Sequence, residues 1–315
     1  MPSVHPIRFG FQTAQQNVTW PELLAVWQEL EQLGFDSGWN FDHFIPIFSD
    51  PAGPCLEAWT MLGAMAAHTS TLRIGTMVTG NTYRHPAVLA KMATTIDVMS
   101  GGRLNFGVGA GWFELEHRAF DIPFPKINDR LHMLDEALEV IKLLWTERQP
   151  TYAGKYYQLQ DAYFAPKPPQ QPHPPIMIGA AGERHALRIV AKHATMWNSF
   201  GSPEVFRGKI GVLRQHCQRI GRDVEEIEKS VLISLVLSDD RTAVERVLQG
   251  SAARMNMPLE EMRARSLAGT RREIISQIEA FVEAGVTHFI LMLAAPYDRA
   301  ALRRFAEEIM PHFRN

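Results

Sequence analysis

Eight short apolar segments, each followed by a stretch of helical periodicity, constrain the fold of this chain more than any other feature. The segments are rich in branched or aromatic residues and are bounded by turn residues, as buried parallel strands are. The predicted strands are Ile7–Gln12, Asp36–Phe41, Leu72–Val78, Arg103–Gly109, Pro175–Gly179, Thr195–Ser199, Ser230–Ser238 and His288–Leu293.

The stretches between these strands follow the 3.6-residue period of a helix. The first opens at Thr19, a suitable N-cap, has Pro21 in its first turn and ends at Gly34. The predicted helices are Trp20–Leu33, Leu56–His68, Ala87–Met99, Asp129–Trp145, Glu183–Lys192, Pro203–Ile220, Ile274–Ala284 and Asp298–Phe313.

Strand–helix alternation of this kind predicts an α/β fold whose parallel sheet is covered by helices. Eight units in 315 residues fit a (β/α)8 TIM barrel. A doubly wound open sheet also alternates, but it usually needs fewer strands, so we favour the barrel. We expect one domain over residues 1–315, because no linker or internal repeat divides the chain.

Two excursions, residues 149–171 and 239–270, exceed what a bare barrel needs. The first reads as a small hairpin followed by a Pro-rich extended arm. The second contains a helix, Thr242–Gly250, and then Met255, Met257 and Met262, which we expect to be packing residues. Both excursions are candidate lids or contact surfaces, or else ordinary surface loops.

Charge and cysteine content exclude several classes of protein. A formal net charge of -2 gives no reason to expect nucleic acid or an anionic membrane as partner. Cys55 and Cys217 lack metal-site spacing and are expected to be reduced thiols. The segment Met1–Phe9 has no apolar leader, and no apolar run approaches the roughly 20 residues that cross a bilayer. We therefore expect a cytoplasmic protein that acts on a small molecule.

The active site of such a barrel lies at the C-terminal ends of its strands. These ends carry small residues, aromatic residues and one histidine, which suits a flat aromatic cofactor held by backbone contacts and stacking. They comprise Asp42-His43-Phe44, Thr79–Thr82, Gly109–Trp112 with Glu114, Glu116 and His117, Gly179–Arg184, and Trp197-Asn198.

His43 is the candidate proton-transfer group, because imidazole titrates near neutral pH. Asp42 beside it could hold a cofactor hydroxyl or orient the loop; alternatively, both residues merely cap a turn. The run Gly107–Gly111 is not a dinucleotide fingerprint, because no clear helix start follows in Trp112–Phe120. Its glycines are expected to let the backbone approach a ring.

Gly179–Gly182 lies where a strand ends and a helix is expected to start at Glu183. Free amide groups there could bind a phosphate, although a tight turn explains the same pattern. No metal site is predicted: His185 and His193 are expected to face solvent or core, and Arg263–Arg272 reads as solvated surface.

Several of these segments together resemble the bacterial luciferase-like flavin and deazaflavin oxidoreductases. The resemblance covers nearly the whole chain and is densest in Arg84–Ala90, Asp97, Ser100–Arg103, Gly107–Trp112 and Pro175–Gly179 with Gly182-Glu183. It implies a luciferase-like TIM barrel with insertion segments and a non-prolyl cis peptide within Gly75–Thr79.

Within that family, Asp42-His43-Phe44 is similar to the branch that depends on the deazaflavin coenzyme F420. The resemblance assigns proton transfer to His43 and cofactor contacts to Asp42 and Thr79. The chain departs from the sugar-phosphate dehydrogenases of that branch, whose second catalytic carboxylate falls at Trp112 and whose loop tryptophan falls at Ile47. The residues expected at the cofactor are Asp42, Thr79, Gly80, Asn81, Gly109, Ala110, Gly111, Trp112, Gly179, Ala180, Ala181, Gly182, Glu183 and Trp197.

Three functions follow as hypotheses. The first is an F420-dependent oxidoreductase that moves a hydride between cofactor and a small organic substrate while His43 handles a proton. The second is a monooxygenase that uses reduced FMN and oxygen on the same barrel. The third, a cofactor carrier without turnover, fits the histidine-bearing mouth least. The resemblance also favours a homodimer or a larger oligomer.

Overall fold

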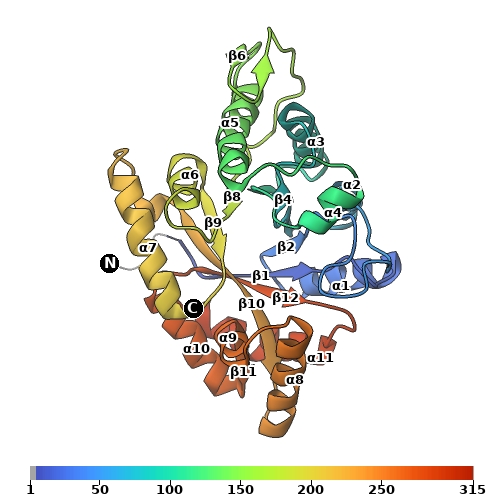
Figure 1. Cartoon of the computed structure of the whole chain (residues 1–315). Coiled ribbons are helices and arrows are strands. Elements are labelled where there is room, and N and C mark those ends of the chain that lie inside the picture. The colour runs from blue at the N-terminus through green and yellow to red at the C-terminus, as the bar shows by residue number, and fades with distance from the viewer. Residues whose placement is uncertain (1–4, 315) are drawn as a thin grey trace.

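Eight parallel strands form a closed barrel in the computed structural model, which describes residues 5–314 (Figure 1). The first four residues, which belong to the segment Met1–Phe9 expected to contain no apolar leader, lie outside the described residues. The barrel runs in the order β12, β1, β2, β3, β5, β8, β9, β10, and the pairing of β10 with β12 closes it. Its strands are β1 (Arg8–Thr13), β2 (Ser37–Asn40), β3 (Arg73–Thr76), β5 (Leu104–Gly109), β8 (Ile176–Gly179), β9 (Met196–Ser199), β10 (Glu228–Leu237) and β12 (His288–Leu293).

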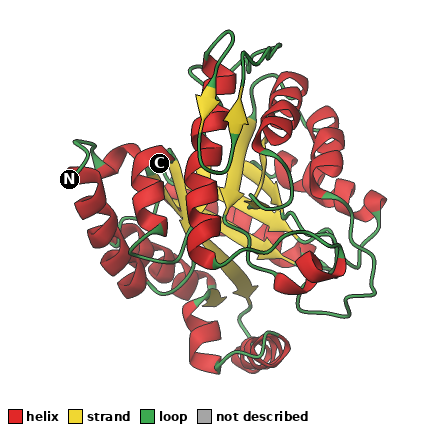
Figure 2. Ribbon diagram, turned by 45° about the horizontal axis from the view of Figure 1, so that its top comes forward, coloured by secondary structure: helices red, strands yellow, loops and turns green. Residues whose placement is uncertain are grey.

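Helices surround the barrel, as Figure 2 shows. The predicted barrel is therefore confirmed, and all eight predicted strands match observed ones within a few residues. The helices are α1 (Trp20–Gln32), α2 (Ala58–His68), α3 (Pro86–Met99), α4 (Glu114–Ala119), α5 (Ile127–Thr146), α6 (Ala186–His193), α7 (Pro203–Gln218), η1 (Val224–Glu226), α8 (Arg241–Arg254), α9 (Leu259–Ala264), α10 (Arg271–Glu283), α11 (Arg299–Arg304), η2 (Phe305–Ile309) and η3 (Met310–Phe313).

The main core lies between the barrel and the helices. Phe11 of β1 packs edge-on against Trp27 of α1, with ring centroids 5.3 Å apart, and both side chains are fully buried. The Trp27 indole N–H donates to Thr13 Oγ1 at 2.7 Å, so its polar atom is also satisfied. A second cluster inside the barrel contains Trp39, Met77, Met177, Met196 and Ile290.

The third strand is interrupted by a bulge. β3 ends at Thr76, the Met77–Val78 peptide is cis, and β4 (Thr79–Gly80) resumes pairing with β5. The expected non-prolyl cis peptide within Gly75–Thr79 is thus confirmed.

The glycines of β5 and β8 make room for this bulge. A Cβ on Gly107 would lie 1.9 Å from the Thr76 carbonyl oxygen, and one on Gly109 or Gly179 would lie 2.9 Å from Val78 Cγ2. A bulky or even a methyl side chain cannot fit at such distances. The expectation that Gly107 and Gly109 admit a cofactor ring therefore needs correction: the protein's own chain fills that space.

Both excursions are built as small units on the barrel. The first forms the antiparallel hairpin of β6 (Tyr152–Ala153) and β7 (Gln158–Leu159), followed by the expected extended arm, and it projects at the top of Figure 1. The second forms α8, α9 and β11 (Ser266–Gly269), with β11 pairing along the end of β10. Val244, Leu248, Ala252 and Met262 give it a core of its own.

Three local expectations are wrong. Residues 114–119 form α4, although the aromatic pair Trp112-Phe113 before them gives no recognisable N-cap. Helix α6 begins at Ala186 rather than Glu183, because residues 183–185 make a turn first. The last predicted helix divides into α11, η2 and η3, with Pro311 in the first turn of η3. Among the described residues, no helix is both long and apolar enough to cross a membrane.

Candidate active site

A cavity of about 510 Å³ opens at the C-terminal ends of the strands, within the size range of small-molecule sites. It is bounded by strand ends, the loop after β2 and the α8–α9 excursion. Nine of the residues predicted for the site line it together: Asp42, His43, Thr79, Gly80, Gly111, Trp112, Gly179, Ala180 and Ala181.

The other predicted residues do not line this cavity. The Asn81 side chain is buried and donates to the Tyr157 hydroxyl at 3.2 Å. The fully buried Trp197 ring belongs to the core and donates to the Ala180 carbonyl oxygen at 2.9 Å. The remaining four are Gly109 and Ala110, at the end of β5, and Gly182 and Glu183, in the exposed turn before α6.

His43 follows β2 and faces the cavity with one nitrogen while the protein holds the other. Its Nδ1 donates to Glu116 Oε1 at 2.6 Å, and no described residue bonds its Nε2. The carboxylate acceptor places the hydrogen on Nδ1, so Nε2 carries a lone pair toward the cavity. His43 is therefore oriented to accept a proton from a bound molecule.

Glu116, from α4, is fully buried and accepts three hydrogen bonds. The Phe44 amide donates to Oε2 at 2.9 Å, and the Tyr83 hydroxyl donates to the oxygen that His43 contacts. Burial alone would raise the pKa of Glu116, but the bonds from His43 and Tyr83 outweigh it and lower that pKa. The carboxylate therefore stays ionised, whereas burial and Glu116 raise the pKa of Tyr83 and keep its phenol protonated.

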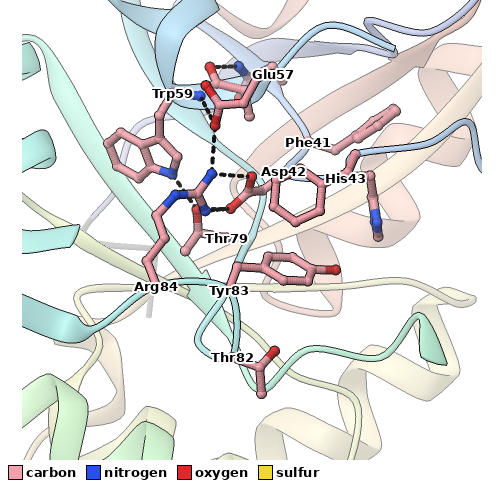
Figure 3. Close-up of polar contacts among 12 residues, drawn as sticks. Phe41, Asp42, His43, Glu57, Trp59, Thr79, Thr82, Tyr83 and Arg84 are labelled. Carbon is pink, nitrogen blue, oxygen red and sulfur yellow. Dashed lines mark hydrogen bonds and ion pairs between the residues drawn. The ribbon is translucent and has the colours of Figure 1, made fainter. Parts of the chain in front are cut away.

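Asp42 points away from His43 into a buried ion-pair network, which Figure 3 shows around the Arg84 guanidinium. Arg84 Nη2 lies 3.0 Å from Asp42 Oδ1 and 2.6 Å from Glu57 Oε1. Complete burial raises the pKa of Asp42, even though Arg84 and Thr79 stabilise its charged form. Burial lowers the pKa of Arg84, but Asp42 and Glu57 outweigh it and the net shift is upward.

The Thr79 hydroxyl belongs to the same network. It donates to Asp42 Oδ2 at 2.8 Å and accepts from the Trp59 indole N–H at 2.6 Å. The polar atoms of Asp42 and Thr79 are thus engaged within the protein, and this network holds the loop that carries His43. Cofactor contacts of these two residues stay a prediction.

Glu114, Glu116 and His117, the ionisable residues that the sequence places after the fourth predicted strand, are candidates for a second acid or base, and the structure separates them. Glu114 is exposed and pairs with Arg118 at 3.9 Å. His117 is buried, with Nε2 2.7 Å from Thr82 Oγ1 and Nδ1 2.7 Å from the Phe113 carbonyl oxygen. Only Glu116 contacts His43 among the three, and it acts through that histidine rather than on the cavity directly.

Several lining residues were missed by sequence reasoning. Met255, Met262 and Arg265 line the cavity, although the sequence predicted packing methionines and a solvated arginine. Met262 has two roles, because it lines the cavity and also packs in the core of the α8–α9 excursion. Gln12, at the end of β1, also lines it, and so does Asn198 of β9, which the sequence places at a strand end but not among the cofactor residues. For these two, their place at predicted strand ends was the available signal.

The thiol nearest to the site is unreactive. Burial, Glu116 and Asp42 raise the pKa of Cys55 to about 12, so it remains protonated at neutral pH. Neither Cys55 nor Cys217 forms a disulfide. Away from the cavity, Asp135, Glu139 and His193 lie close together, but Lys192 Nζ already contacts the two carboxylates at 2.9 and 2.7 Å.

A barrel that has a cavity with one histidine at the C-terminal ends of its strands has the architecture of an enzyme that acts on small molecules. Residues 2–256 match the family described as luciferase-like monooxygenase. The chain belongs to this family, as the resemblance implied.

The comparisons also identify individual relatives. The F420-dependent glucose-6-phosphate dehydrogenase of Microbacterium testaceum is 29% identical over 335 residues, which cover 98% of each chain. The solved F420-dependent secondary alcohol dehydrogenase, in complex with an F420-acetone adduct, has a TM-score of 0.87 at 23% identity and covers 99% of this chain and 100% of its own. A long-chain alkane monooxygenase has a TM-score of 0.82 at 16% identity, covering 99% and 92%. Both solved structures confirm the luciferase-like barrel fold.

Proposed function

We propose that this protein is an oxidoreductase that transfers a hydride between coenzyme F420 and a small organic substrate. The observation that carries the proposal is His43, held at Nδ1 by Glu116 with Nε2 facing the cavity. A relative matched over nearly its whole length, named as an F420-dependent dehydrogenase, supports the choice of cofactor.

The lining fits a flat tricyclic ring. Gly179, Ala180 and Ala181 form a stretch of small residues at the end of β8, where the backbone packs on Val78. Gln12 and Asn198 donate their amide N–H groups within the protein, to the Met77 carbonyl oxygen at 2.8 Å and Ser230 Oγ at 3.0 Å. Their amide oxygens have no described donor, so they can accept bonds from the N–H groups of a ring edge.

When bound, a deazaflavin supplies a carbon that accepts or donates a hydride. In this proposal, His43 Nε2 takes the proton of a substrate hydroxyl as a carbonyl forms, or returns it in the opposite direction. Glu116 keeps the imidazole in the tautomer that can do this and stabilises it once charged. Gly179–Gly182, ahead of α6, stays the predicted phosphate site.

Cofactor titration tests the proposal. The protein contains 7 tryptophans, and Trp112 lines the cavity, so intrinsic fluorescence should be quenched when a ring binds beside it. We expect F420 to bind at least tenfold more tightly than FMN. Tighter binding of FMN, together with oxygen consumption by reduced FMN, would instead support the monooxygenase function. A homodimer in the cytoplasm remains our prediction for the protein's assembly and location.

A further inference from the structure

The cavity offers few charged groups to a ligand. Apart from Tyr83, whose phenol stays protonated, the ionisable residues that line it are Asp42, His43 and Arg265. Asp42 is neutralised by Arg84, and Arg265 pairs with Glu261 and stacks over the Phe200 ring at 4.0 Å. Only Arg265 Nε is buried without a partner among these groups in the described residues. An anionic substrate, once stripped of water here, would find no cation whose charge is not already paired with a carboxylate, and only one free cationic N–H, that of Arg265 Nε.

An aromatic pair stands beside the proton-accepting nitrogen. Trp112 and Phe48 stack with ring centroids 6.2 Å apart at 22°. The ring centroids of His43 and Trp112 lie 5.6 Å apart in an edge-to-face arrangement. Both side chains are half exposed, 56% for Trp112 and 51% for Phe48, so they pack against little of the protein. Phe48 also has a backbone φ of 57°, unfavourable for an aromatic residue. Exposed, aligned rings of this kind mark a binding surface.

A methionine-rich wall adds to the apolar lining. Met255 and Met262 come from the α8–α9 excursion, and Leu232 and Met292 come from β10 and β12. Methionine side chains are flexible and polarisable, so they adapt to apolar groups of different shape. The α8–α9 excursion is therefore part of the site rather than an ordinary surface loop.

We infer that the substrate is an uncharged, largely apolar alcohol or the matching carbonyl compound, and that Trp112 and Phe48 determine its specificity. The inference rests on the proposed function. The alcohol would lose a hydride from its carbinol carbon to the bound deazaflavin and its hydroxyl proton to His43 Nε2. The carbon–oxygen bond becomes double, and the reverse reaction restores the alcohol. The apolar group packs on the Trp112–Phe48 pair while the oxygen lies at His43.

A substrate series with F420 tests the substrate class. We expect kcat/KM, followed by the loss of oxidised deazaflavin absorbance, to rise from 2-propanol through cyclohexanol to 1-phenylethanol, by about fourfold per buried methylene. Glucose 6-phosphate should be turned over at least 100-fold less efficiently than 1-phenylethanol. Preference for glucose 6-phosphate, or no turnover of any alcohol or matching ketone while F420 binds, would overturn the inference alone. Failure of F420 to bind would overturn the proposed function as well.

The Trp112→Ala variant tests the specificity residue. It should lower kcat/KM for 1-phenylethanol at least tenfold while changing that for 2-propanol less than threefold. Acetophenone, which oxidised F420 cannot reduce, should bind the F420-loaded variant at least tenfold more weakly by calorimetry. Tyr163→Ala, an 87% exposed aromatic residue on the arm after the hairpin, is the matched control and should change neither quantity. An equal loss of kcat/KM for both alcohols, with unchanged acetophenone binding, would show that Trp112 does not determine specificity.

Discussion

Replacing Glu116 by Gln tests how the protein holds its proton-transfer group. The Phe44 amide donates to Glu116 Oε2, so the glutamine oxygen should take that position and its NH2 group should face His43 Nδ1. An NH2 donor there favours the tautomer with hydrogen on Nε2. Such an imidazole presents an N–H to the cavity and cannot accept a proton from the substrate.

The size of the effect follows from the bond that is lost. A hydrogen bond to a charged group contributes about 1.5–3 kcal/mol, and about 1.4 kcal/mol corresponds to a tenfold change in rate. We therefore expect kcat to fall about 10- to 150-fold. A wrong tautomer can cost as much as ~10⁴ in a serine protease triad, which sets an upper bound. F420 affinity should change little, because Glu116 does not line the cavity.

The assay compares kcat, its pH dependence and F420 binding in the wild type and the variant. Glu114→Gln is the control: this residue lies on the same helix, but it is exposed and pairs only with Arg118. Its kinetics should match the wild type. A Glu116→Gln enzyme with wild-type kcat and an unchanged pH profile would refute the reasoning and leave His43 without a positioning residue.

Three further predictions concern the cavity and its supports. His43→Asn should keep F420 affinity by fluorescence titration but lower kcat by about 10²–10⁴, the usual contribution of general acid–base catalysis; wild-type turnover would exclude the role. Arg84→Met leaves the buried Asp42 carboxylate unpaired, so urea unfolding should show a loss of about 3–5 kcal/mol, and a loss below about 1 kcal/mol would contradict the burial argument. Gly182→Asp adds negative charge in the turn before α6 and should weaken F420 binding with an unchanged circular dichroism spectrum; unchanged affinity would mean that the phosphate lies elsewhere.

Glu116 should also contribute to stability in a pH-dependent way. Its folded-state pKa is lowered from 4.5, so the contribution is present above about pH 4.5 and is lost as pH falls through the lower folded-state value. Urea unfolding of the wild type between pH 7 and pH 3 should show this loss, and Glu116→Gln should show less of it.

The barrel was predictable because its strands are buried on both faces. Segments such as Arg103–Gly109 therefore read as apolar runs, and the observed strand β5 covers Leu104–Gly109. Helix ends were harder wherever tertiary contacts replace capping signals. Helix α4 has no side-chain cap, and it is held instead by two of its own side chains, Glu116 and His117, which are buried. Its existence could not be inferred from local periodicity.

The sequence could predict the site residues only where they lie at the ends of predicted strands. His43, Thr79, Gly111 and Gly179 come from four different strand ends, and they meet at one cavity because parallel strands in a barrel share a C-terminal edge. Pairings between side chains do not follow from that rule. The sequence predicts that Asp42 contacts a cofactor, but it gives no sign of the pairing of its carboxylate with Arg84, 42 residues further on.

His43 and Glu116 illustrate why such pairings matter for function. They are 73 residues apart, His43 in the loop after β2 and Glu116 in helix α4, yet one 2.6 Å contact determines which nitrogen faces the cavity. Arg84 and Thr79 bond Asp42, the neighbour of His43. The Phe44 amide and the Tyr83 hydroxyl bond Glu116, so each side of this contact is held by polar groups. A loop fixed in this way cannot drift by an ångström without breaking several hydrogen bonds at once. The rigidity of the His43 loop therefore comes from the ion-pair network behind it, while substrate adaptation is left to the methionines and the exposed aromatic pair in front.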